Sequence, residues 1–139
     1  MSLSLFTEIN WLAVLVAAIA YFAIGAIWYA PLFGKKWVKY HRIDMNDPDA
    51  KKGVAGIMLT SFLIMFIVCI GLSILVVKMD LHLFLSGVKL GLLTGICFSA
   101  AAISITYVYL KKPVGLHMID GLYHVVGHVA AALILCAWQ

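Results

Sequence analysis

Apolar residues dominate four long stretches of the chain, and polar residues concentrate in the segments between them. Each stretch holds about 20 residues or more, the length that an α-helix needs to cross a hydrocarbon core ~30 Å thick. The pattern predicts an all-α fold in which a single domain, residues 1–139, forms a bundle of four transmembrane helices. The predicted helices cover about residues 10–30, 54–77, 83–109 and 116–138.

Residues near the ends of the predicted helices carry the expected signals. Trp11 opens the first helix and Trp28 and Tyr29 close it, which fits the aromatic belts found at membrane interfaces. Pro31 is expected to stop this helix, because proline cannot donate the next backbone hydrogen bond. Before the second helix, Pro48 follows an aspartate and can occupy a first helical position.

Positive charge gathers in two of the segments between the apolar runs. The basic loop of residues 33–53 contains six Lys or Arg, and the segment after the third run contains Lys111 and Lys112. Cytoplasmic loops of membrane proteins carry such an excess. The distribution therefore predicts that both segments face the cytoplasm and that the N and C termini lie on the non-cytoplasmic side.

The overall composition fits the same conclusion. The chain is 65% hydrophobic and only 12% charged, and a water-soluble domain with so few charges could not cover its surface. Membrane lipid is therefore the expected partner. The net charge of +4 follows from the basic loops, so no nucleic-acid partner is predicted. The three cysteines lie inside apolar runs without a CxxC pair, which argues against a disulfide framework or a zinc knuckle.

The third predicted helix carries a ladder of small residues. Gly87, Gly91, Gly95 and Ser99 recur at intervals of four residues. Such residues leave a groove in which another helix can approach closely, which is how helices associate in lipid. The ladder predicts tight helix packing, either with another helix of the same chain or with a second copy in a homo-oligomer.

The last predicted helix carries a stripe of ionisable residues. His117, Asp120, His124 and His128 follow one another at spacings of three, four and four, which places them within an arc of about 80° on a helical wheel. Burying such groups in hydrocarbon costs a few kcal/mol each, so they should face protein or water. These four residues, with Tyr123 beside them, are the candidates for binding or proton relay.

Three interpretations of this stripe remain open. In the first, it only holds helices together, through hydrogen bonds to Tyr107, Thr94, Ser99 or backbone carbonyls of the third helix. In the second, it forms a polar pathway for a proton, an ion or a small solute. In the third, His124 and His128 ligate a metal or haem, but the sequence shows neither HExxH nor a matching ligand pair on another helix. No metal site and no cofactor are therefore predicted.

Two parts of the chain carry a family pattern. They are Asn10-Trp11-Leu12-Ala13-Val14, Gly25, Trp28-Tyr29, Pro31, Phe33-Gly34 and Trp37 near the start, and Ile119-Asp120-Gly121, Tyr123-His124 and Trp138 near the end. In these positions the chain resembles the domain of unknown function 1761 family over nearly its whole length. The resemblance implies a small, multi-pass bacterial inner-membrane protein with four helices. It implies no activity, because the family has none established, and His128 lies outside its pattern.

The leading functional hypothesis is a transport-like or solute-binding role for a polar interior of Asp and His. The alternative is a structural or accessory membrane protein whose stripe serves only helix packing or homo-oligomerisation. An enzyme is not favoured, because the sequence shows no nucleophile–base–oxyanion set, no phosphate loop and no carboxylate pair on two helices.

Overall fold

The computed structural model describes residues 5–138, and this part of the chain is built from helices without a β-strand. Residues 1–4 and 139 of the predicted domain lie outside the described residues. Four helical spans are long and apolar enough to cross a membrane: Trp11–Leu32, Val54–Lys78, Phe84–Tyr109 and Val114–Ala137. The predicted all-α class and its four long apolar helices are confirmed, with ends close to the predicted positions.

In chain order the helical elements are α1 (Leu5–Glu8), α2 (Trp11–Ile27), η1 (Trp28–Leu32), α3 (Gly34–His41), η2 (Pro48–Lys51), α4 (Val54–Lys78), α5 (Phe84–Thr94), η3 (Gly95–Ala100), α6 (Ala101–Tyr109) and α7 (Val114–Ala137). The elements η1 and η3 are π-helical turns, in which each N–H reaches back one residue further than in an α-helix, and η2 is a 3₁₀ turn. The first span therefore combines α2 with η1, and the third combines α5, η3 and α6.

The ends of the first span follow from its sequence. Asn10 caps α2, because its side-chain oxygen accepts a hydrogen bond from the Ala13 N–H at 3.1 Å. At the other end, Pro31 does not stop the span as predicted: the regular α-helix ends at Ile27, and the π-turn continues to Leu32. Ile27 lies four residues before Pro31, where a proline ring collides with the carbonyl of a regular α-turn.

The second span begins at Val54, after a separate short turn that starts at Pro48. Pro48 does occupy a first helical position, but it belongs to the short turn η2, capped by the Asp47 side chain at 2.9 Å from the Asp49 N–H. Gly53 then adopts a φ of +73°, a left-handed conformation that glycine reaches without steric cost. This turn of the backbone separates η2 from α4.

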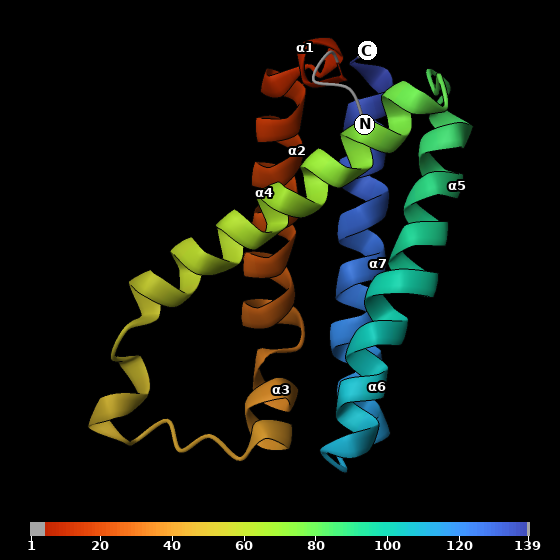
Figure 1. The fold of residues 1–139 in the computed structure, drawn as a ribbon. Coiled ribbons are helices and arrows are strands. Elements are labelled where there is room, and N and C mark those ends of the chain that lie inside the picture. The colour runs from red at the N-terminus through yellow and green to blue at the C-terminus, as the bar shows by residue number, and fades with distance from the viewer. Residues whose placement is uncertain (1–4, 139) are drawn as a thin grey trace.

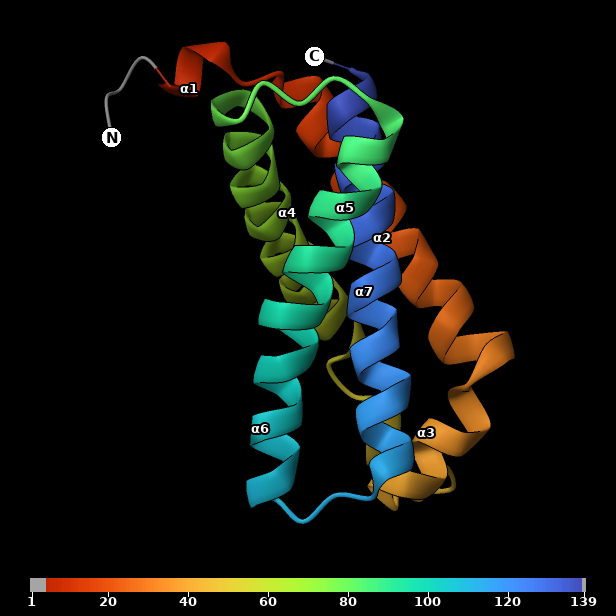
Figure 2. The ribbon, with the colours of Figure 1, turned by 90° about the vertical axis from the view of Figure 1, so that its right-hand side faces the viewer.

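α7 is the central helix of the bundle (Figures 1 and 2). α2 and α5 pack closely against it, and α4 and α6 contact it less. Of its most apolar window 56% is buried, compared with 22–28% in the other three spans. The helix with the predicted ionisable stripe is thus the one that the others surround.

Small buried residues occur on both α2 and α7. Ala13, Ala17 and Ala18 on α2 and Ala131 and Ala132 on α7 have no exposed surface. Side chains of this size let two helix backbones approach closely, so that dispersion contacts form along them. The close contact of α2 with α7 sets where the aromatic residues of the first span can reach.

α4 diverges from the bundle at one end. Figure 1 shows α4 crossing the bundle obliquely, and every residue from 52 to 60 is exposed. At that end lie α3, η2 and the link of residues 110–113, whereas α1 and the end of α7 lie at the opposite end. The two basic segments are therefore gathered at one end of the molecule.

Candidate functional site

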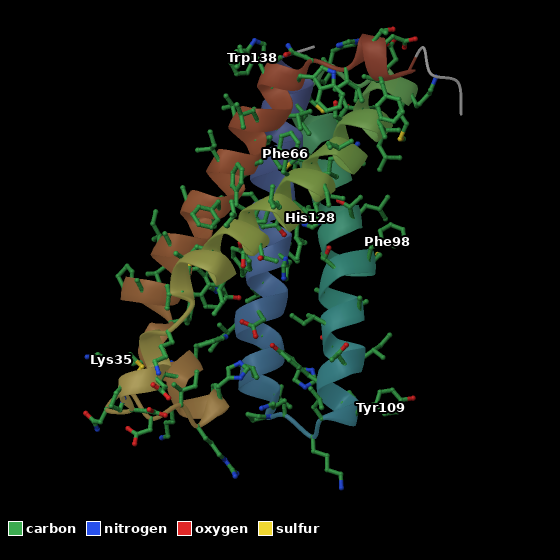
Figure 3. The ribbon with its side chains drawn as sticks, turned by 60° about the vertical axis from the view of Figure 1, so that its left-hand side comes forward. Lys35, Phe66, Phe98, Tyr109, His128 and Trp138 are labelled. Carbon is green, nitrogen blue, oxygen red and sulfur yellow. The ribbon has the colours of Figure 1, made fainter. Side chains whose placement is uncertain are left out.

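The ionisable stripe of α7 faces the interior of the bundle. Asp120 and His128 keep only 3% and 4% of their surface exposed, and His117 and His124 are half-buried. Figure 3 shows His128 about midway along the bundle, between Trp138 at one end and the end that carries Lys35. Burying polar groups is costly unless they are hydrogen-bonded, so the partners of these residues decide what the site can do.

Asp120 is held by two tyrosine hydroxyls from different spans. Tyr29 Oη, on η1, donates to Asp120 Oδ1 at 2.7 Å, and Tyr107 Oη, on α6, donates to Asp120 Oδ2. Each side-chain oxygen of Asp120 has its own O–H donor, so neither acceptor is left unsatisfied in the interior. We call Asp120, Tyr29 and Tyr107 the carboxylate clamp.

One turn further along α7, a single hydroxyl joins two histidines. Tyr21 Oη lies 2.6 Å from His124 Nδ1 and 3.2 Å from His128 Nδ1. His128 Nδ1 also lies 2.8 Å from the backbone carbonyl oxygen of His124, and His128 Nε2 lies 3.0 Å from Ser99 Oγ. We call Tyr21, His124, His128 and Ser99 the imidazole bridge.

The carbonyl in the imidazole bridge determines where the protons sit. Because the carbonyl oxygen of His124 can only accept, His128 donates to it from Nδ1, and His128 Nε2 accepts from the Ser99 hydroxyl. Tyr21 then donates to His124 Nδ1, which leaves the proton of His124 on Nε2. This assignment, made from the hydrogen-bond network, keeps both imidazoles neutral.

Two glycines make room for the aromatic rings of the site. A Cβ atom on Gly127 would lie 2.0 Å from Tyr21 Cε2, far inside contact distance. A Cβ atom on Gly25 would lie 3.0 Å from Tyr123 Oη. The Tyr21 ring can therefore reach both histidines only because α7 carries no side chain at position 127.

Tyr123 touches both the carboxylate clamp and the imidazole bridge. Its ring centroid lies 5.1 Å from that of Tyr29 and 4.9 Å from that of His124. Its hydroxyl donates to Met65 Sδ at 3.5 Å, a weak acceptor. Tyr123, a predicted site residue, thus acts here as an aromatic spacer between the two groups.

His117 adjoins the site from the end of the bundle that carries the basic segments. Its ring centroid lies 5.5 Å from that of Tyr107, with the two rings at 65°. The contact places His117 beside a donor of the carboxylate clamp. Of the predicted stripe, Asp120, His124 and His128 are drawn into hydrogen bonds with other spans, and His117 contacts the site through a ring.

The sequence prediction missed the partners on the first span. Trp28 and Tyr29 are predicted as interfacial belt residues, but Trp28 Nε1 donates to the carbonyl oxygen of Ile119 at 2.9 Å, and Tyr29 binds Asp120. A signal is present in the sequence, because Tyr21, Trp28 and Tyr29 stand at i, i+7 and i+8 on one helical face. A Trp-Tyr pair near a helix end fits a belt equally well.

The glycine ladder of the third span packs against α7 of the same chain. Cβ atoms on Gly87, Gly91 and Gly95 would lie 3.1, 2.4 and 2.8 Å from backbone atoms of α7. Backbone atoms cannot move aside as a flexible side chain can, so positions 91 and 95 require glycine for this contact, and at position 87 a Cβ atom would be tighter than an ordinary contact. Ser99, the fourth member of the ladder, belongs to the imidazole bridge.

Two hydrogen bonds expected from the packing interpretation are present. Tyr107 binds Asp120, and Ser99 binds His128. The third named candidate, Thr94, donates instead to the Leu90 carbonyl oxygen of its own helix at 2.8 Å. The same contacts that join the spans also build the polar interior, so packing and a polar pathway are not mutually exclusive.

The metal interpretation names His124 and His128 as the ligands. Across residues 5–138, no three His, Cys, Asp or Glu side chains are grouped so that they could hold a metal ion. The Nδ1 atoms of His124 and His128 both face Tyr21 Oη. The two histidines are thus arranged around a shared hydroxyl.

Two surface pockets lie away from the buried network. One, of about 190 Å³, lies beside Lys89, and the other, of about 240 Å³, lies beside Lys112. Neither Asp120 nor His124 lines either of them. The network is therefore reached from neither of these pockets in the conformation that the structure describes.

These features define the chain as a helical protein with four spans of membrane-crossing length and a buried Asp–His–Tyr network. The chain belongs to the family described as "Protein of unknown function (DUF1761)", whose model matches residues 12–136. The resemblance drawn from the sequence is thereby confirmed. No curated protein and no solved structure matches the chain. Because the family description names no activity, a function has to be argued from the site.

Proposed function

We propose that the protein is an integral membrane protein with a transport-type function, in which the buried network takes up a proton and passes it along α7. The observation that carries the proposal is the imidazole bridge, in which one hydroxyl lies within hydrogen-bond distance of both His124 and His128. Chains of intramembrane Asp and His are typical of proton relays.

Membrane placement is supported by the outer faces of the spans. Large apolar side chains such as Ile67, Phe98 and Val108 are 65–66% exposed, and extended apolar surface of this kind is disfavoured in water. We place the end that holds residues 33–53 and 110–113 in the cytoplasm, because most of the Lys and Arg lie there. Both termini then face the other side, and for a bacterial family member the membrane is the inner one.

The imidazole bridge can pass a proton from His128 to His124 through the Tyr21 hydroxyl. Ser99 gives its hydroxyl proton to His128 Nε2 and takes up an incoming proton in its place, which makes the His128 ring cationic. His128 then gives its Nδ1 proton to Tyr21 Oη, while Tyr21 gives its own proton to His124 Nδ1. The net result is one proton moved from His128 to His124, with Tyr21 neutral before and after.

The carboxylate clamp lies next on the way toward the cytoplasmic end. Asp120 is one turn from His124, about 6 Å along the helix axis, and Tyr123 packs against His124 and against Tyr29 of the clamp. This separation exceeds a hydrogen bond, so a water molecule or a side-chain rotation has to complete the step. Asp120 would then take the proton and release it toward His117.

A flux assay on reconstituted protein tests the proposal. Proteoliposomes with a pH-sensitive dye inside are subjected to a pH step, and wild type is compared with Tyr21→Phe, which keeps the ring and removes the bridging hydroxyl. Wild type is expected to equilibrate faster than empty liposomes, and Tyr21→Phe is expected to lose about tenfold or more of that excess rate. Tyr109→Phe, whose ring is 84% exposed, is the matched control and should behave as wild type.

Two outcomes would contradict the relay. Wild-type vesicles that equilibrate no faster than empty ones would leave the packing role as the function of the stripe. A Tyr21→Phe variant with unchanged flux would show that protons do not pass through the bridging hydroxyl.

A further inference from the structure

A polar pocket of about 240 Å³ lies at the basic end of the molecule, outside the buried network. Its walls come from two segments that are far apart in the sequence, the end of α3 and the link between α6 and α7. The lining residues are Tyr40, Arg42, Leu110, Lys111, Lys112 and Pro113. Figure 2 shows α3 beside the start of α7, where these two segments meet. We call this the basic pocket.

The basic pocket collects positive charge without a counter-charge. Arg42, Lys111 and Lys112 line it, and no carboxylate does. The ion pairs found within the described part of the chain are Lys52 with Asp49 and His82 with Asp80, so none of the three cations is paired there. Like charges held in one pocket repel, and an anion that enters it relieves this repulsion.

Donors other than the three cations also face this region. A Cβ atom on Gly115 would lie 2.5 Å from Tyr40 Oη, so the absence of a side chain there is what lets this hydroxyl lie against the start of α7. α7 begins after Pro113 with no side-chain cap, and the positive end of its dipole adds to the potential of the pocket. Guanidinium, ammonium and hydroxyl donors together match the oxygens of a phosphate group.

We propose that the basic pocket binds the phosphate group of an anionic phospholipid in the cytoplasmic leaflet. The pocket lies at the end of two spans, the depth at which headgroups are found when the spans cross a bilayer. Beside it, Val108, Tyr109 and Leu110 are 66%, 84% and 59% exposed and form an apolar flank. The acyl chains of a phospholipid would lie along this flank, whereas a free phosphate ion would gain nothing from apolar surface.

The inference rests on the membrane placement proposed above but not on proton relay. A different account of the same cations exists, because Arg42 and Lys111 follow the C-termini of α3 and α6, where positive charge interacts favourably with the helix dipole. On that account the cations stabilise helix ends and retain no particular lipid. The experiment therefore has to distinguish a specific lipid-binding site from nonspecific attraction between basic residues and anionic lipid.

The backbone offers a variant that removes the charges without harming the fold. Arg42 and Lys111 have φ values of +56° and +49°, a left-handed conformation that glycine adopts with less strain than any other residue. The pocket variant is therefore Arg42→Gly, Lys111→Gly and Lys112→Gln. The matched control, Lys35→Gln, Lys36→Gln and Lys39→Gln, removes the same number of charges from exposed positions of α3.

Lipid retention is measured by native mass spectrometry of the protein in detergent, with phosphatidylglycerol, phosphatidylcholine or inorganic phosphate added. Wild type, with three basic contacts in the pocket, is expected to retain phosphatidylglycerol about a hundredfold better than phosphatidylcholine. The pocket variant should lose most of this preference, since each basic contact near a membrane surface is worth about fivefold. The control variant should keep it, and Lys112→Gln alone should lower it about fivefold.

The outcomes separate the possibilities. Equal retention by the wild type and the pocket variant, or an equal loss in the control variant, would overturn the basic pocket as a lipid site. Competition by inorganic phosphate at concentrations similar to those of the lipid would show that the occupant is soluble phosphate and would overturn the lipid assignment. Tyr21→Phe should retain lipid as wild type does, so failure of the relay would not be mistaken for failure of this inference.

Discussion

The carboxylate clamp and the imidazole bridge are neighbours on α7, but they differ in how readily their hydrogen-bonded groups can exchange protons. In the clamp, Asp120 accepts from two hydroxyls that belong to two other spans. In the bridge, Tyr21, His124 and His128 each carry both a donor and an acceptor in neutral form. The clamp joins three spans, and uptake of a proton by Asp120 costs it one of its two accepted hydrogen bonds, whereas the bridge can exchange its protons without breaking the contacts between helices.

Removing the acceptor of the clamp should have the largest effect on stability. Asp120→Ala leaves the hydroxyls of Tyr29 and Tyr107 without their acceptor, and we expect a loss of about 2–4 kcal/mol because one unsatisfied buried donor costs ~1–3 kcal/mol. Asp120→Asn keeps one carbonyl oxygen and should lose about half as much. Unfolding in mixed detergent micelles measures both. If Asp120→Ala lowers the free energy of unfolding by less than about 0.5 kcal/mol, the clamp does not hold the three spans together.

Disturbing the bridge through its glycine should have a smaller and more local effect. Gly127→Ala places a Cβ atom 2.0 Å from the Tyr21 ring, and overpacking of this kind costs about 1–3 kcal/mol. The displaced ring should also lose its hydrogen bonds to the histidines, so proton flux falls while the clamp stays intact.

Gly121→Ala is the matched control for this variant. It lies on the same helix, and its Cβ atom would lie 3.4 Å from Ala100 Cβ, an ordinary contact. We expect neutral or slightly raised stability, because alanine favours the helix over glycine by roughly 0.5–1 kcal/mol. If Gly127→Ala and Gly121→Ala lose equal stability, the space that Gly127 leaves for the Tyr21 ring is not the cause of the loss at position 127.

The fold could be predicted further than the site, for a physical reason. Apolar run length is a property of one segment, so all four spans were predictable, and helical spacing was enough to indicate that Asp120 and His128 point inward. The partners depend on how two helices pack. Nothing in the last span indicates that Tyr21 and Tyr29 would reach it, or that the regular α-helix ends at Ile27 and η1 then presents Trp28 and Tyr29 to α7.

The smallest expected effect is a change in the titration midpoint of His41. This residue lies outside the spans, and Asp120 of the clamp influences its pKa. Burial, and then the nearby Lys112, lowers the pKa of His41, while Asp120 acts to raise it. The unfolded value is about 6.5, so the folded protein binds fewer protons at His41 than the unfolded chain does. Stability from this group is therefore complete above pH ~6.5 and falls as the pH drops below it.

Trp37 gives a way to follow this titration, because its ring centroid lies 4.2 Å from that of His41 and a protonated imidazole quenches indole fluorescence. The pH-dependent change that disappears in His41→Gln belongs to His41. In Asp120→Asn we expect the midpoint to move to lower pH, since a negative charge that favours the protonated imidazole has been removed. An unchanged midpoint would mean that Asp120 is a neutral acid in the wild type. It would then be able to donate as well as accept, and the contrast between a fixed clamp and an exchanging bridge would no longer hold.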